Sequence, residues 1–263
     1  MNCKNCHTEL KAESDFCHNC GGKVIRNRLT IKNLLSHFGE TFLNYDNKFL
    51  QTFITLFKKP EEVIETYITG TRKKYVNVIS YFAIAITISG LYLFILKKFF
   101  PETIDYSFMV APGQEEFQKD YMSFIQEYMS LVMMLYVPVY ALMARLSFIG
   151  INKFNYTELL VIFLYLQGQM SITTAILGTI LAFFGISQGI ASFIFIPLMI
   201  IFCAFCLKRL YKINLANLLL RTLLFFAILG VVFVITSILM AIKMYFDGTF
   251  EQMMEAKKAA SGG

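Results

Sequence analysis

The sequence predicts an all-α integral membrane protein with a small cysteine-rich module at its N-terminus. Of the 263 residues, 56% are hydrophobic and 16% are charged. A soluble domain carries about 25% charged residues, so this chain has too few to coat a globule. The apolar residues also fall in long runs, and the mean hydropathy is +0.56. Lipid is therefore the expected solvent for most of the chain.

Five apolar runs have the length of membrane-crossing helices, because about 20 residues span the hydrocarbon core. They cover residues 77–96, 129–149, 157–184, 190–207 and 217–242. Pro138 and Pro197 lie inside two of these runs, and neighbouring helices tolerate such prolines in a membrane. Residues 77–246 are therefore predicted to form a bundle of about five transmembrane helices, with an acidic extracytoplasmic loop at 99–128.

The remaining segments are predicted to be peripheral. Residues 23–76 contain a basic linker and apolar residues at helical spacing. This pattern predicts amphipathic helices at the cytosolic membrane face, or packed against the bundle. Pro60 suits the first turn of one such helix, and Gly70 suits its end. The polar tail 247–263 ends in small residues and is expected to be disordered.

Residues 1–22 carry the strongest chemical motif in the chain. Cys3-x2-Cys6 and Cys17-x2-Cys20 each present two thiolates from one tight turn. Two such pairs complete a tetrahedral sulfur shell that suits Zn²⁺. A shell of three cysteines with His7 or His18 is the alternative. Because four thiolates leave no open position, the zinc is predicted to be structural, and it would supply the folding energy that so short a ribbon lacks.

The charge distribution predicts orientation rather than nucleic-acid binding. The net charge is +6, but the basic residues cluster beside the apolar runs, as the positive-inside rule expects. Residues 1–25 have no apolar signal segment, which places the N-terminus in the cytosol. Five spans then place the C-terminus outside the cytoplasm. Cytosolic thiols stay reduced, which favours a metal over disulfides.

Several polar residues inside or near the predicted spans could form an intramembrane polar site: Arg145, Glu158, Gln167, Gln169 and Arg221. A charge within a span is costly and usually paired, so Glu158 is the natural partner of Arg221. The alternative is that the charged side chains extend to the headgroups. The glutamines, in "YLQGQMSITT", either line a cavity or form interhelical hydrogen bonds around Gly168.

A basic aromatic cluster precedes the first span. The sequence "GTRKKY" contains Arg72, Lys73, Lys74 and Tyr75. These residues could contact anionic lipid headgroups, at about 1 kcal/mol per basic residue. The alternative is a simple topological anchor with an interfacial tyrosine.

The ribbon together with "YITGTRKKY" resembles an uncharacterised bacterial family of zinc-ribbon membrane proteins, a domain of unknown function. The residues that carry the resemblance are Cys3, Cys6, Cys17, Cys20, Thr52, Pro60, Tyr67, Gly70, Arg72 and Tyr75. The resemblance implies architecture and a bacterial inner membrane, but no mechanism. The five-span layout with a cytosolic N-terminus is also similar in topology to the Yip family of membrane-trafficking proteins.

These observations favour a non-enzymatic membrane scaffold or docking protein, with membrane lipids and a cytosolic protein partner bound through residues 1–70. Acid, base and open metal site are all missing, so an enzyme is not expected. The rival function is a small-solute or lipid transporter that uses the polar residues of the spans. If the polar residues of the spans line one water-filled cavity, transport is favoured. If they hydrogen-bond one another in a dry bundle, a scaffold is favoured. The oligomeric state is left open.

Overall fold

The computed structural model describes the chain except for residues 25, 27–29, 32–47, 106–122, 152 and 247–263. The tail, the centre of the acidic loop and most of the linker predicted from the sequence lie outside the described residues. The chain divides into two compact units, Met1–Asn47 and Lys48–Gly263. Each unit is described by itself.

The first unit contains the cysteine ribbon, which has very little regular structure. Two isolated antiparallel bridges join Asn2 to Glu9 and Phe16 to Lys23. Its small core consists of Cys3, Leu10 and Cys17, with Cys6 and Val24 packed against it. A core of this size contributes little burial energy, so a metal at the cysteines would have to supply much of the stability.

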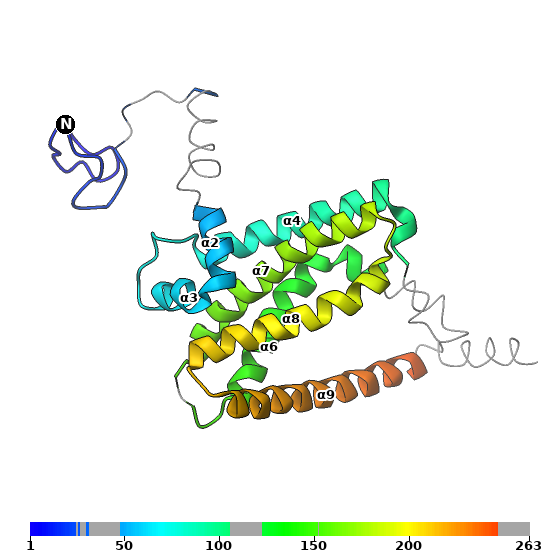
Figure 1. Ribbon diagram of the computed structural model, residues 1–263. Coiled ribbons are helices and arrows are strands. Elements are labelled where there is room, and N and C mark those ends of the chain that lie inside the picture. Colours follow the sequence, from blue (N-terminus) through cyan, green and yellow to red (C-terminus); the bar gives the residue numbers. More distant parts are fainter. Residues whose placement is uncertain (25, 27–29, 32–47, 106–122, 152, 247–263) are drawn as a thin grey trace, which may run out of the picture. The chain divides into compact units, whose positions relative to one another are not determined.

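The second unit is entirely helical over its described residues (Figure 1). Its elements are α2 (Lys48–Lys58), α3 (Pro60–Ile68), α4 (Val78–Phe99), the short η1 (Pro101–Thr103), α6 (Met129–Ser147), α7 (Tyr156–Phe183), α8 (Gln188–Tyr211) and α9 (Leu215–Phe246). Five of them, α4 and α6 to α9, are long and apolar enough to cross a membrane.

Helix α7 is the centre of the bundle and α9 is at its edge. Helix α7 contacts α3, α4, α6 and α8, whereas α9 contacts α6 and α8. Of the most apolar stretch of each helix, 61% is buried in α7 and 6% in α9. Figure 1 shows α9 alongside the other long helices rather than among them.

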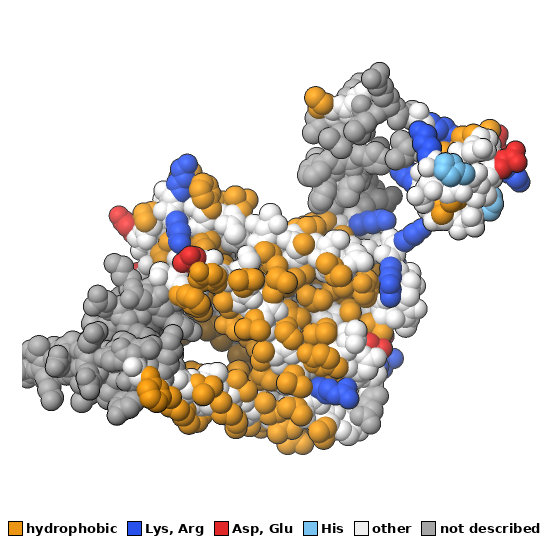
Figure 2. All heavy atoms as spheres, turned by 180° about the vertical axis from the view of Figure 1, so that it is seen from behind, with side chains coloured by type: hydrophobic (Ala, Val, Ile, Leu, Met, Phe, Trp, Pro, Cys, Tyr) orange, Lys and Arg blue, Asp and Glu red, His pale blue; other side chains and the backbone are white. Residues whose placement is uncertain are grey.

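The outside of the bundle is mainly apolar. Figure 2 shows hydrophobic side chains over most of one face. Large side chains such as Phe183 and Phe233 are 75% and 70% exposed. Soluble monomers rarely expose continuous apolar areas of this extent. The five apolar helices and this surface together indicate a membrane location.

Helices α2 and α3 pack against the bundle through their apolar faces. Leu56, Val63 and Ile64 are fully buried in the main core. The Phe57 ring lies 5.2 Å from the Phe202 ring of α8. The predicted amphipathic helices therefore use these faces to cover one end of the bundle.

Helix α7 extends past the start of α4, and this extension gives α3 a surface to pack against. The first turn of α4 lies opposite Tyr165, whose hydroxyl donates to the Val76 carbonyl at 2.8 Å. Helix α7 begins nine residues earlier, at Tyr156, so it extends about 13 Å past α4. Helix α3 packs on that extension, with its Tyr67 ring 6.0 Å from Tyr165.

Candidate functional site

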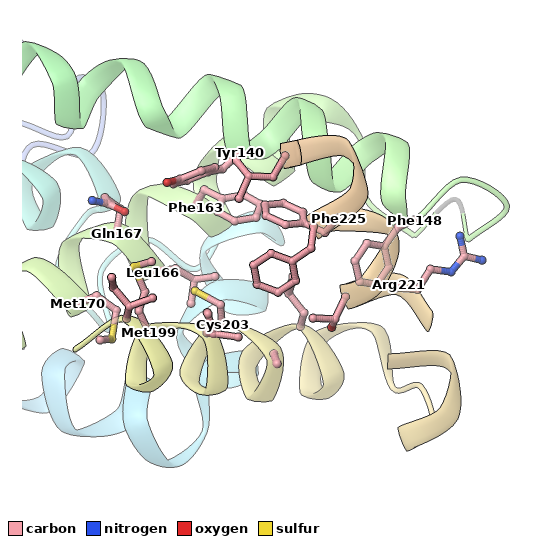
Figure 3. Close-up of a pocket in the computed structure, with 17 residues that line it drawn as sticks. Tyr140, Phe148, Phe163, Leu166, Gln167, Met170, Met199, Cys203, Arg221 and Phe225 are labelled. Atoms are coloured by element: carbon pink, nitrogen blue, oxygen red, sulfur yellow. The ribbon is translucent and has the colours of Figure 1, made fainter. Parts of the chain in front are cut away.

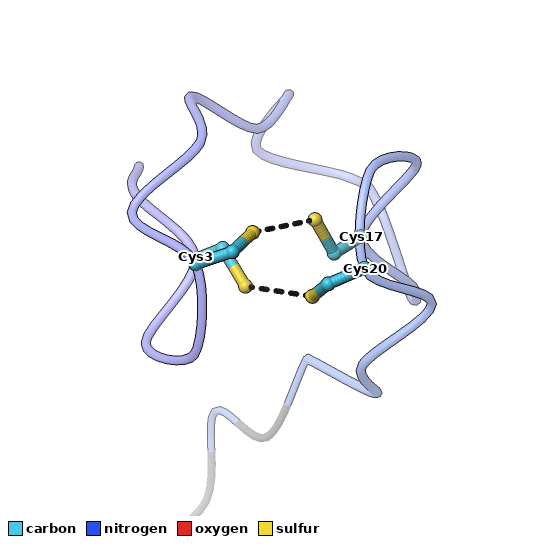
Figure 4. A group of neighbouring side chains, drawn as sticks. Cys3, Cys17 and Cys20 are labelled. Atoms are coloured by element: carbon cyan, nitrogen blue, oxygen red, sulfur yellow. Dashed lines mark hydrogen bonds between the residues drawn. The ribbon is translucent and has the colours of Figure 1, made fainter.

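The four predicted cysteine ligands lie together (Figure 4). Their sulfurs are all within 4.8 Å of one another. The Cys3–Cys20 and Cys6–Cys17 sulfur pairs are 3.6 and 3.5 Å apart. A tetrahedron with zinc–sulfur bonds of about 2.3 Å places its sulfurs roughly 3.8 Å apart. The geometry of this cluster therefore fits a tetrahedral metal site.

The two cysteine pairs are built by the same backbone turn. The amide of His7 donates to the Cys3 carbonyl, and that of Gly21 donates to the Cys17 carbonyl, each at 2.9 Å. His7 and Gly21 both have left-handed backbone, with φ of 59° and 68°. Glycine adopts this conformation without strain. Each turn brings its two sulfurs to the same side of the loop.

Hydrogen bonds favour the thiolate, the form that binds metal, at Cys6 and Cys20, whereas burial and the neighbouring thiols raise the pKa of Cys17 to about 11. The Thr8 hydroxyl lies 3.2 Å from the Cys6 sulfur, and its hydroxyl and amide lower the pKa of Cys6 to about 6. The Asn5 side chain and the Gly22 amide lower the pKa of Cys20. His7 and His18 are exposed and outside the ligand cluster. The four sulfurs could hold one metal ion, and four thiolates would complete its tetrahedral shell.

Gln169, predicted to be an intramembrane polar residue, is fully buried, and both its side-chain oxygen and its side-chain nitrogen are hydrogen-bonded. It accepts a hydrogen bond from the Tyr81 hydroxyl of α4. Its side-chain amide donates to the Phe53 carbonyl of α2 at 3.0 Å. One side chain of α7 thus connects three helices, as expected for an interhelical hydrogen bond in a membrane protein.

Two tyrosine–glycine contacts complete the α4–α7 interface. A Cβ at Gly168 would lie 3.2 Å from the Tyr81 ring, and one at Gly178 would lie 2.3 Å from the Tyr92 hydroxyl. The Tyr92 hydroxyl donates to the Gln188 side chain. The glycines let the two helices approach closely, while each tyrosine hydroxyl bonds a glutamine beside its contact.

Gln167 lies on another side of α7 and does not join Gln169. It lines a cavity of about 200 Å³ between α6, α7, α8 and α9 (Figure 3). Arg221 also lines this cavity, but the other lining residues are mainly Phe, Leu, Ile and Met. The predicted polar residues therefore do not converge on one polar site.

The expected ion pair between Arg221 and Glu158 does not form. One terminal nitrogen of Arg221 donates to the carbonyls of Ser147 and Ile149, at 2.8 and 2.7 Å. These carbonyls lie at the end of α6, where backbone acceptors have no helical partner and a positive charge is favourable. Glu158 instead accepts from the Asn155 amide at 2.7 Å, in a capping box that starts α7.

The predicted headgroup cluster is held mainly by protein contacts. Lys74 and the Tyr75 hydroxyl each bond the Glu62 carboxylate at 2.8 Å, and Tyr75 is buried. Arg72 lies over the Tyr67 ring, 5.4 Å from its centroid. Tyr75 is thus buried and bonded to α3 through Glu62. Lys73 is exposed.

The three carboxylates of α3 form ion pairs that were not predicted from the sequence. Each of its glutamates pairs with a cation from another segment: Glu61 with Arg209 of α8, Glu62 with Lys74, and Glu65 with Lys153 at 2.7 Å. We call these three residues the glutamate clasp. Hydrogen bonds from Arg209 and Lys74 lower the pKa of Glu61 and Glu62, respectively.

The sequence contained a signal for these ion pairs. Helix α3 has three acidic residues among its nine, and the basic residues of the chain flank its apolar runs. Lys153 also donates to the Leu210 carbonyl at the end of α8. The clasp thus joins α3 to the end of α8, to the loop between α6 and α7, and to the loop before α4.

Comparisons with known proteins give one local match. No curated protein matches the chain, and no solved structure matches it. The model of one protein family matches a segment that runs from just before α2 to Gly90 of α4. This segment contains the glutamate clasp, Phe53 and Tyr81. The ribbon lies outside it, and no similarity to the Yip family is shown. Over residues 46–90 the chain matches the family described as "Protein of unknown function (DUF3667)".

Proposed function

We propose that the protein is a non-enzymatic membrane protein that docks a cytosolic protein partner through residues 1–70, while its five apolar helices anchor it. In this proposal the ribbon binds one structural Zn²⁺. The N-terminus lies in the cytosol of a bacterium, the helices in its inner membrane, and the C-terminus outside the cytoplasm.

The bonding of Gln169 carries the proposal. The most polar stretch of any apolar helix is in α7, and its central glutamine is 0% exposed and bonded to Tyr81 and Phe53. Thr173, one turn later, donates to the Gln169 carbonyl at 2.8 Å. Polar groups used in this way hold helices together. This use of the polar groups supports a scaffold rather than a path for a hydrated solute.

The ribbon has features suited to docking rather than catalysis. Its four sulfurs fit a closed metal shell. Phe16 is 55% exposed at the surface of the ribbon. Exposed aromatic residues on a small rigid module are common anchors in protein interfaces. A ribbon fixed by its metal would present Phe16 in one orientation.

A transporter of lipids or small solutes is the second candidate. The cavity beside Gln167 and Arg221 favours it. Gln167→Leu removes the polar group from the cavity wall without touching the Gln169 bonds. The corresponding change at Gln169 would break the helix contacts and cannot distinguish the two functions.

The test compares two cysteine variants of the full chain in nanodiscs. Cys17→Ser opens the metal shell, whereas Cys206→Ser changes a cysteine of α8 outside the cavity and leaves the shell intact. We expect one zinc per wild-type chain by elemental analysis, and a defined cytosolic protein whose retention is lost only with Cys17→Ser. Equal retention by all three forms would count against docking. Solute or lipid flux in proteoliposomes that disappears with Gln167→Leu would support transport instead.

A further inference from the structure

The cavity between α6, α7, α8 and α9 is elongated along the helices. Its wall in α8 runs from Ile196 to Leu207, and its wall in α9 runs from Arg221 to Leu229. At 1.5 Å per residue these stretches are about 16 and 12 Å long. Figure 2 shows the surface hollowed between α9, the lowest row of side chains, and the rest of the bundle.

The lining suits an apolar occupant. Figure 3 shows the Phe225 and Phe163 rings together with Met170, Met199 and Cys203 around the space. A buried water needs two to four polar partners, and most of this wall offers none. Methionine side chains adapt readily to a flexible apolar chain. The occupant is therefore expected to be hydrocarbon.

A positive charge lies at one end of this cavity. Figure 3 shows the Arg221 guanidinium directed away from the apolar lining. Both of its hydrogen bonds to α6 carbonyls come from one terminal nitrogen, although a guanidinium carries five N–H donors. Arg145 is in the last turn of α6, two residues before Ser147, whose carbonyl Arg221 contacts.

No carboxylate among the described residues neutralises these arginines. Within the described parts of the chain, no carboxylate lies within 4.0 Å of either guanidinium. The glutamates near this end of the bundle have other partners, because the glutamate clasp binds three other cations and Glu158 caps α7. An anion from outside the protein would complement the charge.

We propose that this cavity binds an anionic phospholipid. One acyl chain lies along α8 and α9 in the cavity, and the phosphate binds Arg221 with support from Arg145. Arginine matches phosphate because its planar fork can donate two parallel hydrogen bonds. This site differs from the 72–75 cluster suggested by the sequence, and it does not depend on whether the ribbon docks a partner.

Native mass spectrometry of the full chain tests the proposal. The chain is released from nanodiscs that hold equal amounts of phosphatidylglycerol and phosphatidylethanolamine with the same acyl chains. We expect retention of phosphatidylglycerol in preference to phosphatidylethanolamine. Arg221→Gln is expected to lower that preference about fivefold, the effect of one basic residue near a lipid phosphate. Arg221→Lys keeps the charge and should keep most of the preference.

Two further variants separate binding from folding. Ala204→Phe fills the cavity and leaves both arginines in place, so it should lower retention of either lipid. Lys58→Gln removes one positive charge from the end of α2, away from the cavity, and should change nothing. The proposal is overturned if the wild type shows no preference, if Lys58→Gln acts like Arg221→Gln, or if Ala204→Phe retains as much lipid as the wild type.

Discussion

Helices α7 and α9 have the same apparent role in the sequence, since each is long and apolar enough to cross a membrane. In the structure, 61% of the apolar stretch of α7 is buried against other helices, compared with 6% of that of α9. Helix α9 is the more apolar of the two. The helix with the stronger hydrophobic signal is therefore the one that contacts the least protein.

This difference follows from the solvent. Lipid tails are as apolar as leucine, so burying an apolar side chain between helices gains little free energy. Close packing at small residues and interhelical hydrogen bonds decide which helix is central instead. Helix α7 supplies both, through Gly168, Gly178 and Gln169. The bonded polar groups and small residues of α7 mark the core of this protein better than its hydropathy does.

The glycines of the two helices should give the largest contrast. Gly178→Ala places a methyl group 2.3 Å from the Tyr92 hydroxyl, so the ring must move and release Gln188. We expect a loss of about 1–3 kcal/mol in the free energy of unfolding. Gly230→Ala in α9 meets nothing within 4 Å and should be neutral or slightly stabilising. Unfolding in mixed micelles titrated with denaturing detergent measures both, and equal losses would refute the contrast.

The two glutamines of α7 provide a contrast within one helix. Gln169→Leu leaves the buried Tyr81 hydroxyl without its acceptor, which should cost about 1–2 kcal/mol. Gln167→Leu, at the cavity wall, should change stability by less than about 0.5 kcal/mol. The free energy of unfolding of both variants is measured by the same titration with denaturing detergent. A larger loss at position 167 would mean that the central network has been misidentified.

Removing the N-terminal cap of α7 should destabilise the whole bundle, whereas removing that of α9 should destabilise only the start of that helix. Asn155 accepts from the Glu158 amide and Asn214 from the Asn217 amide, each at 2.9 Å. Removing either cap with alanine should cost about 1 kcal/mol. Asn155→Ala should lower the global unfolding midpoint because α7 contacts most of the bundle. Asn214→Ala should mainly speed hydrogen exchange at the start of α9, and protection there equal to wild type would contradict this.

The smallest effect should come from the glutamate clasp, whose ion pairs are partly exposed. The pKa values of Glu61 and Glu62 lie below their ordinary 4.5 in the folded protein. The Glu61 and Glu62 pairs therefore stabilise the fold fully above about pH 4.5, and this contribution is lost as the pH falls through the lowered pKa values. Unfolding midpoints between pH 3 and 7 should show the decline, and added salt should weaken it.

A pair of glutamine substitutions isolates the clasp from other acid effects. Glu61→Gln removes the partner of Arg209 and should reduce the acid dependence of the midpoint. Glu102→Gln, on η1 at the other end of α4, should leave the pH profile unchanged. Identical profiles for the two variants would show that the clasp does not contribute.

Much of the architecture could be predicted from the chain because its signals are local. Lengths and hydropathy of the runs gave five apolar helices, since the hydrocarbon thickness sets their length. The spacing of Cys3, Cys6, Cys17 and Cys20 predicted a cluster that the structure brings within 4.8 Å. The partner of Arg221 could not be predicted, because carbonyls at the end of a helix are acceptors that any nearby cation can use.

The sequence by itself determined where the apolar helices lie and that four sulfurs can hold a metal, because hydropathy and ligand spacing act over short stretches of chain. The tertiary structure decided which helix is central, that α3 joins three segments through its glutamates, and that Gln167 and Gln169 face different surroundings. These depend on contacts between residues far apart in the chain, as between Tyr81 and Gln169. In lipid, hydropathy does not choose among such contacts, whereas fit at small residues and hydrogen bonding do.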